Sequence, residues 1–234
     1  MDAKLLLEQL FPAGQRVDFD GQYFSGTGQT ADGEVAVIGT TDAAAIGVEL
    51  AFRIAGQVLE IVRSHPRRPI LLLVDTQGQR LSRRDELLGI NGYMAHLAKC
   101  IEVARRAGHR VIGLVYSQAV SGGFLASSML ADTCYALPEA EVRVMNLPAM
   151  SRITKIPVER LQDLSQISPV FAPGVENYLR MGAIAELWQG DLADCLEKAL
   201  AATVGHDARR DRGLARQGRL LAGPVAERVR HGGV

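Results

Sequence analysis

The chain has 234 residues, of which 47% are hydrophobic and 22% charged, enough to bury one substantial core. Its 26 basic and 26 acidic side chains balance, so no global field favours a nucleic acid or a membrane surface as partner. Three widely spaced cysteines without a CxxC pair argue against a disulfide framework and against a metal site, and the N-terminus lacks a secretory layout. We therefore expect a soluble cytoplasmic protein.

Segments with strand and helix patterns alternate along most of the chain. Residues 21–33 are rich in Gly, Thr and Ser and predict loop and turn. The expected elements after them are a strand at 34–40, a helix at 47–64, a buried strand at 69–76, a long helix at 85–109, a buried strand at 110–117, a helix at 122–129, two short strands within 132–146, and helices at 157–165 and 191–203. This alternation predicts an α/β domain with a mostly parallel sheet.

The last part of the chain has a different composition. From residue 207 onward it holds seven arginines against three acidic residues. We expect a single domain over residues 1–206 followed by an Arg-rich tail over residues 207–234. The tail is interpreted either as a solvated chain end or as a basic surface for an acidic partner.

The stretch VYSQAVSGGFLASSML, residues 115–130, places Gly122 and Gly123 where a buried strand passes into a helix. The first N–H groups of a helix have no partner inside it, and the helix dipole adds partial positive charge there. Two glycines at this point would let a ligand oxygen approach the backbone, as in an oxyanion hole. The same glycines fit close packing of the helix on the sheet, with Ser121 as the N-cap.

A second turn, DTQG at residues 75–78, ends the preceding buried strand. Ligands of open α/β sheets bind at the carboxyl ends of strands, so the N–H of Gly78 or Gln79 is expected to face the same crevice. For Asp75 we favour a role in bracing the turn over direct contact with a ligand.

Candidate substrate-binding residues flank the two turns. They are Thr76, Gln77, Arg83, Ala119 and Val120. The arginines that follow the first turn are either a solvated helix start or a place where one of them, Arg83, meets a substrate carboxylate or phosphate.

Ser121 would need a base within reach to act as a nucleophile. None of the five histidines stands in the sequence context of a catalytic triad, and the pentapeptide GxSxG is absent. A serine hydrolase is therefore the weaker alternative.

Together, the segments LLLVDTQGQRLSRRDE and VYSQAVSGGFLASSML, separated by one long helix, resemble the carboxyltransferase branch of the crotonase superfamily. That branch has a DTPG turn, a helix, an apolar strand and an SGG helix start, and Gln77 stands where it usually has proline. Over roughly residues 20 to 200 the chain is similar to the gamma subunits of biotin-independent malonate decarboxylase. The resemblance implies a crotonase-like domain of ββα spiral units.

The resemblance also implies a heteromer with a homologous beta subunit and an acyl-carrier subunit. A malonyl thioester on the phosphopantetheine-type arm of the carrier would become an acetyl thioester and CO2, with no tightly bound cofactor. Gly78, Gln79, Ser121, Gly122 and Gly123 would form the catalytic site, whose backbone N–H groups stabilise an enolate. The alternatives are the carboxyltransferase subunit of a biotin-dependent malonate decarboxylase or acyl-CoA carboxylase, and a non-catalytic scaffolding subunit.

Overall fold

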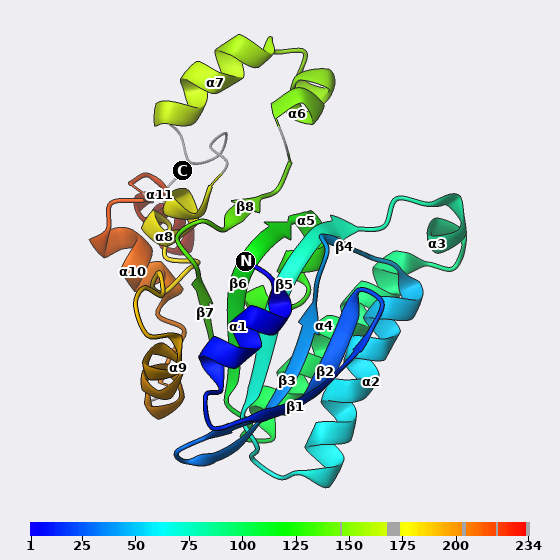
Figure 1. Ribbon diagram of the computed structural model, residues 1–234. Coiled ribbons are helices and arrows are strands. Elements are labelled where there is room, and N and C mark those ends of the chain that lie inside the picture. Colours follow the sequence, from blue (N-terminus) through cyan, green and yellow to red (C-terminus); the bar gives the residue numbers. More distant parts are fainter. Residues whose placement is uncertain (146, 168–173, 203–204, 219, 233–234) are drawn as a thin grey trace.

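The computed structural model describes residues 1–145, 147–167, 174–202, 205–218 and 220–232, and it confirms an α/β fold (Figure 1). The main path of the sheet runs in the order β1-β2-β3-β5-β6-β7. The strands are β1 (Gln15–Asp20), β2 (Tyr23–Thr30), β3 (Gly33–Thr40), β4 (Ala44–Ile46), β5 (Ile70–Gln79), β6 (Val111–Val120), β7 (Thr133–Ala136) and β8 (Glu141–Arg143). Pairing is antiparallel from β1 to β3 and parallel in all later pairs, so the sheet is mostly parallel as expected.

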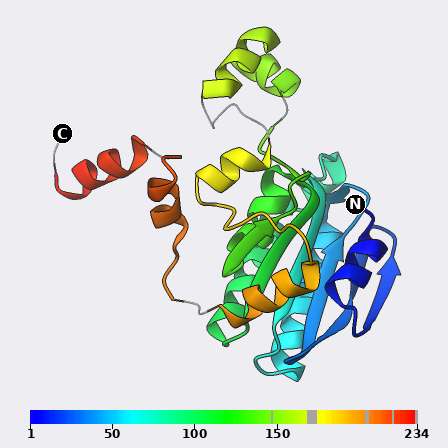
Figure 2. The ribbon, with the colours of Figure 1, turned by 60° about the vertical axis from the view of Figure 1, so that its left-hand side comes forward.

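Helices cover both faces of the sheet. On one face α2 (Val48–Ser64) and α4 (Ile90–Arg106) pack through residues such as Ile54, Val58 and Leu97. On the other, α1 (Ala3–Leu10) and α9 (Leu192–Ala201) contribute Leu6 and Leu196 to a second core (Figures 1 and 2). Among the described residues, no helix is both long and apolar enough to span a bilayer.

The remaining α-helices all come after β5 in the chain. They are α3 (Arg83–Leu87), α5 (Ser121–Leu125), α6 (Leu147–Thr154), α7 (Val158–Ile167), α8 (Val175–Arg180), α10 (Arg209–Ala215) and α11 (Ala222–Arg230). In Figure 1, α6 and α7 stand above the body of the domain, beyond the carboxyl ends of β5 and β6. Two expected boundaries lie outside the described residues: Asn146, the end of the segment with two short strands, and Thr203, the end of the helix expected at 191–203.

The glycine-rich stretch at residues 21–33 is not a loop, because β2 occupies most of it. Gly28 lies within this strand against the ring of Phe11, whose atoms are 2.4 Å from where a Cβ would stand. Here glycine serves close packing inside a strand and does not mark a turn. Composition alone does not distinguish these two uses of glycine.

The long helix expected over residues 85–109 is interrupted. Gly89 adopts a φ of +75°, which separates α3 from α4. Ser82 caps α3 by accepting the N–H of Asp85, and Asp85, almost fully buried, accepts the N–H of Val48 at 2.8 Å. The N-cap residue of α2 is Gly47, which has no side chain that could accept an N–H of the first turn. The carboxylate of Asp85, from another segment, acts as this cap instead.

The C-terminal segment contains α10 and α11, so it is not merely a solvated chain end (Figure 2). The guanidinium of Arg216 donates to three backbone carbonyls, those of Leu179 at 2.8 Å, Ile184 at 3.0 Å and Ala185 at 2.7 Å. These bonds attach the end of α10 to α8 and to the segment that follows it. The division of the chain at residue 206 remains a prediction.

Other arginines of this segment also have partners within the chain. Arg209 donates to the carbonyl of Met129, and Arg210 and Arg230 pair with Glu227. Arg219 lies outside the described residues. Much of the positive charge that could have attracted an acidic partner is therefore paired with Glu227 or bonded to backbone carbonyls of the same chain.

Asp85 makes stability depend on pH in a defined direction. The hydroxyl of Ser82 and then the N–H of Val48 hold the pKa of Asp85 below its ordinary value. A carboxylate with a depressed folded-state pKa stabilises the fold fully above its unfolded pKa of about 3.9, and this contribution is lost as the pH falls toward the folded pKa. We expect Asp85→Asn to be less stable at pH 7 and to lose less stability on acidification below about pH 4. Urea unfolding at pH values from 3 to 7 measures the free energy of unfolding. The same loss of free energy between pH 4 and pH 3 in both proteins would contradict this expectation.

Removing the guanidinium of Arg216 should destabilise the attachment of the C-terminal helices. We expect Arg216→Met to cost about 2–4 kcal/mol, because three carbonyls lose a charged donor at once. Urea unfolding measures the free energy, and limited proteolysis with mass spectrometry measures the exposure of residues beyond Ala202. The matched control is Arg228→Met, since Arg228 is exposed. Equal stability of the two variants would refute the proposed attachment.

Candidate functional site

The two sequence motifs meet at the carboxyl edge of the sheet. The pairing of β5 with β6 shifts register after Val74 and resumes with Thr76 opposite Ala119. Both strands continue to Gln79 and Val120, so DTQG lies inside the end of β5 and is not a turn that follows a strand. β4 and β8 pair with these extended ends and frame them on either side.

Gly123 and Gly78 are in direct contact. A Cβ on Gly123 would lie 3.0 Å from the backbone of Gly78 and 3.0 Å from Oγ1 of Thr76. A Cβ on Gly122 would lie 2.8 Å from Oε1 of Gln79. Gly123 is therefore packed directly against the end of β5, whereas the space beside Gly122 is filled only by the end of the flexible Gln79 side chain.

Ser121 does not cap the helix, contrary to the sequence prediction. The N-cap of α5 is Val120, which has no side chain able to accept, and Ser121 has a φ of +51°. The N–H of Gly122 instead donates to Oε1 of Gln79 at 3.1 Å. The cap comes from the neighbouring strand, a contact that local sequence rules do not predict.

Asp75 braces the site, as predicted, but across three segments instead of within its own turn. Its carboxylate, 6% exposed, accepts the N–H of Ala43 at 2.9 Å and the N–H of Gln118 at 3.2 Å. Its own N–H donates to Oγ1 of Thr40 at 3.3 Å. The side chain of Asp75 thus links β6 to the segment that leads into β4, and its backbone N–H links β5 to the end of β3.

The hydroxyl of Thr76 is fully engaged inside the protein. It donates to the carbonyl of Ala44 at 2.7 Å and accepts the N–H of Gly78 at 3.0 Å, and Thr76 has no exposed surface. The N–H of Gly78, like that of Gly122, therefore already has an acceptor in the chain. Thr76 is placed to shape the strand end, and its side chain does not reach solvent.

The other candidate residues are distributed around this strand end. Gln77 and Arg83 are exposed, Ala119 is buried and Val120 is half-buried. A further cation, which the sequence interpretation missed, is Arg143 on β8, in register with Val120. Its guanidinium contacts Glu141 and lies 3.4 Å from Oε1 of Gln118. Only the pairing of β8 with β6 brings this arginine near the site, so no local signal identified it.

Backbone strain is concentrated at this edge of the sheet. Asp42 and Ala43 have φ values of 53° and 49°, and together with Ser121 they are half of the six non-glycine residues with positive φ in the described part of the chain. L-residues adopt this conformation at an energetic cost, and such residues cluster at functional sites. The strain supports the choice of this edge as the candidate site.

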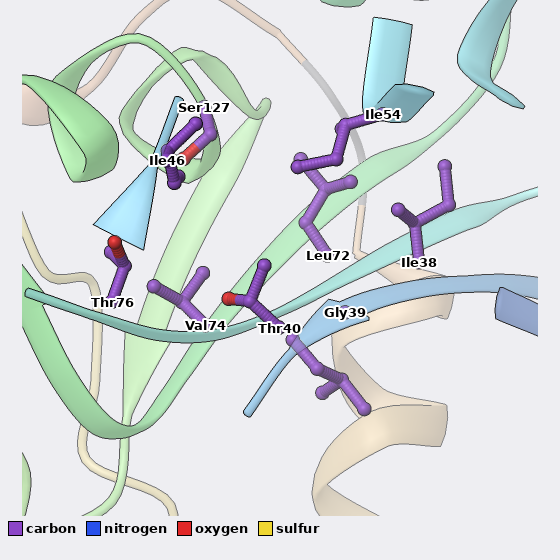
Figure 3. Close-up of a pocket in the computed structure, with 10 residues that line it drawn as sticks. Ile38, Gly39, Thr40, Ile46, Ile54, Leu72, Val74, Thr76 and Ser127 are labelled. Atoms are coloured by element: carbon purple, nitrogen blue, oxygen red, sulfur yellow. The ribbon is translucent and has the colours of Figure 1, made fainter. Parts of the chain in front are cut away.

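A small pocket lies behind the site, between the sheet and α2 (Figure 3). Its lining includes Ile38, Ile54 and Leu72, and Thr76 and Ser127 lie toward one end of it. The hydroxyl of Ser127 donates to the carbonyl of Gly123 at 2.6 Å. None of the lining residues is charged, so this pocket does not suit a carboxylate.

The side chains of four histidines contact groups other than Ser121. His96 stacks on Phe52, His109 bonds to the carbonyl of Arg68, and His206 and His231 pair with Asp211 and Glu227. Because a serine nucleophile needs an adjacent base, this arrangement does not favour covalent catalysis by Ser121.

The role of Asp75 leads to a testable expectation. In Asp75→Asn one of the two accepting oxygens becomes an NH2 donor, which leaves the half-buried N–H of Ala43 or Gln118 without its partner. We expect a loss of about 2–4 kcal/mol of unfolding free energy and faster amide hydrogen exchange at Ala43 and Gln118. Asp18→Asn, at an exposed position of β1, is the control. Unchanged exchange at both amides in the variant would argue against the bracing role.

Comparison with known proteins places this geometry in a family. The family model for the malonate decarboxylase gamma subunit matches residues 41–233. The chain is 32% identical over 202 residues to the malonyl-S-ACP:biotin-protein carboxyltransferase MADD of Malonomonas rubra, across 77% of this chain and 69% of that protein.

Solved structures agree with this match. The chain is similar to a chain of a Pseudomonas malonate decarboxylase hetero-tetramer in complex with coenzyme A, at 26% identity, with a TM-score of 0.82 and 97% of both chains covered. A structure of the Pseudomonas hetero-tetramer with malonate gives 25% identity and a TM-score of 0.76, again over 97% of both chains. These likenesses confirm the fold that the motifs implied. The chain belongs to the malonate decarboxylase gamma subunit family.

Proposed function

We propose that this chain acts with a homologous beta subunit to decarboxylate a malonyl thioester, giving an acetyl thioester and CO2. The observation that carries the proposal is the direct contact of the DTQG strand end with the SGG helix start in a chain of this family. The Pseudomonas relatives, solved with coenzyme A and with malonate, support a malonyl thioester as the substrate class.

The chemistry needs stabilisation of negative charge more than it needs a nucleophile. When the bond between the α-carbon and the carboxylate breaks, its electron pair moves toward the thioester oxygen and CO2 leaves. The resulting enolate takes up a proton at the α-carbon to give the acetyl group. The backbone N–H groups of Gln79, Gly122 and Gly123 would donate hydrogen bonds to this oxygen and stabilise its charge. Loss of one such donor typically lowers the rate by a factor of about 10²–10³.

The carboxylate of the substrate needs a partner of opposite charge or a set of N–H donors. Arg143, in register with Val120, and the exposed Arg83, at the start of α3, are the arginines we propose for this role. We propose that one of them, with residues of the beta subunit, orients the departing carboxylate.

The partner subunit would pack at the carboxyl edge of the sheet and complete the site. Leu81, before α3, and Leu87, its last residue, are 84% and 77% exposed. Apolar side chains of this size beside a functional edge favour a protein interface. We also propose that an acyl-carrier subunit presents the thioester on a phosphopantetheine-type arm. The free cysteines suit a complex in the reducing cytoplasm.

A second candidate is the carboxyltransferase subunit of a biotin-dependent decarboxylase. The 32% identity to the Malonomonas carboxyltransferase favours it. The two candidates share the enolate chemistry and differ in whether CO2 is released or its carboxyl group passes to biotin.

The test is decarboxylation by the chain coexpressed with its beta and carrier subunits. We expect labelled CO2 to be released from a malonyl thioester by the complex and not by this chain alone, because the site lies at the subunit interface. We also expect avidin to leave the rate unchanged and a fluorophosphonate probe to leave Ser121 unlabelled.

Each contrary result has a distinct meaning. Inhibition by avidin would favour the biotin-dependent candidate. Full activity of the beta subunit without this chain would support a scaffolding role, and labelling of Ser121 would support a hydrolase.

A further inference from the structure

The helical hairpin formed by α6 and α7 projects from the body of the domain. In Figure 1 it stands beyond the carboxyl ends of β5 and β6, the edge that carries the candidate site, and Figure 2 shows the same projection from a second side. The two helices pack against each other, and of their described residues Leu161 alone is buried. Since α6 has no buried residue, the hairpin presents a surface on which another molecule can bind.

The tip of the hairpin, residues 152–157, is held in shape by bonds within the hairpin. The N–H of Lys155 donates to the carbonyl of Ser151 at 2.9 Å, and the hydroxyl of Thr154 donates to the carbonyl of Met150 at 2.8 Å. Lys155 has a φ of +62°, a conformation that L-residues adopt at an energetic cost. The backbone of the tip is therefore fixed before any partner binds, which lowers the entropic cost of binding.

The tip exposes two cations and one apolar side chain. Arg152, Ile153 and Lys155 are all exposed, Ile153 at 68%. Within the part of the chain that the structure describes, neither cation has an acidic partner. The two acidic residues of the hairpin, Glu159 and Asp163, both belong to α7. Unpaired positive charge is thus gathered at the tip, around an exposed apolar residue.

This combination suits a protein with an acidic and partly apolar face. A single phosphate would bind to the cations and would gain nothing from the apolar side chain between them. Protein interfaces combine an apolar centre with charged residues at the rim, and complementary charges guide the partners together. The proposed carrier subunit has to reach this same edge of the sheet. Its phosphopantetheine-type arm is joined to it through a phosphodiester, which places negative charge on the face that is turned toward the site.

We propose that the tip of the α6–α7 hairpin is the docking surface for the acyl-carrier subunit. Arg152 and Lys155 pair with acidic groups around the attachment point of the arm, and Ile153 packs against an apolar side chain between them. The inference rests on the proposed function, which supplies the carrier as partner. It adds the part of this chain that recognises the carrier, separate from the groups that act on the thioester.

The experiment uses the complex of this chain with its beta subunit and offers the malonyl group on the carrier subunit or on coenzyme A. Both forms have a phosphorylated pantetheine arm, but coenzyme A has no protein surface. We measure KM for both substrates, and the Kd of the acetylated carrier by fluorescence anisotropy, which needs no turnover. The variants are Arg152→Glu, Lys155→Glu and Ile153→Ser. The matched control is Lys99→Glu, the same charge reversal at an exposed position of α4.

We expect each charge reversal at the tip to raise the carrier Kd, and KM for the carrier-bound substrate, by about three- to tenfold. Ile153→Ser should raise both constants by about threefold. KM for malonyl-coenzyme A should stay within about twofold of wild type in all variants, since no protein surface is lost. Because the attraction joins exposed charges, raising the salt from about 50 to about 300 mM should weaken the wild type more than Arg152→Glu. Lys99→Glu should bind the carrier like the wild type.

Three results would overturn the docking surface. Unchanged carrier affinity in both charge reversals would exclude an electrostatic contact at the tip. Equal effects on the carrier-bound substrate and on malonyl-coenzyme A would mean that the tip binds only the phosphate of the arm. Loss of association with the beta subunit in size-exclusion chromatography would assign the tip to that interface. A wild-type complex that binds the acetylated carrier but releases no CO2 from either substrate would support the docking surface and count against the proposed function.

Discussion

The parallel pairing of β5 with β6 is the constraint on which the rest of the site depends. It places Thr76 opposite Ala119 and so brings two segments together that are more than forty residues apart in sequence. Gly78 and Gly123 touch only because this pairing continues past the irregularity after Val74. The flanking strands β4 and β8 then attach to ends that already stand beside each other.

A single buried carboxylate keeps this edge in shape. Asp75 accepts N–H groups from Ala43 and Gln118, which belong to segments on either side of β5. Carboxylate bonds to backbone N–H groups are stronger than neutral ones, and a buried N–H without a partner is costly. The strained φ values of Asp42, Ala43 and Ser121 persist beside these bonds, so the geometry of the edge is imposed by its surroundings and not by local preference.

The chemistry of the family fits a site built mainly from backbone. Decarboxylation of a malonyl thioester develops charge on one oxygen, and fixed N–H donors stabilise it without reorganisation. In this chain the N–H groups of Gly78 and Gly122 are bonded to the side chains of Thr76 and Gln79.

The sequence by itself determined the order of buried strands and helices, the position of both glycine motifs at strand ends, and the resemblance that led to the family. These features are local, since hydrophobic periodicity and short motifs are written in neighbouring residues. Sequence reasoning misjudged β2, where Gly28 makes room for Phe11, and the long helix that Gly89 divides. It also gave Ser121 a capping role that belongs to Gln79. It did not predict that Arg143 lies beside Val120 or that Arg216 bonds to the carbonyl of Leu179. Each of these depends on which distant segment lies alongside, and only the packed tertiary structure decides that.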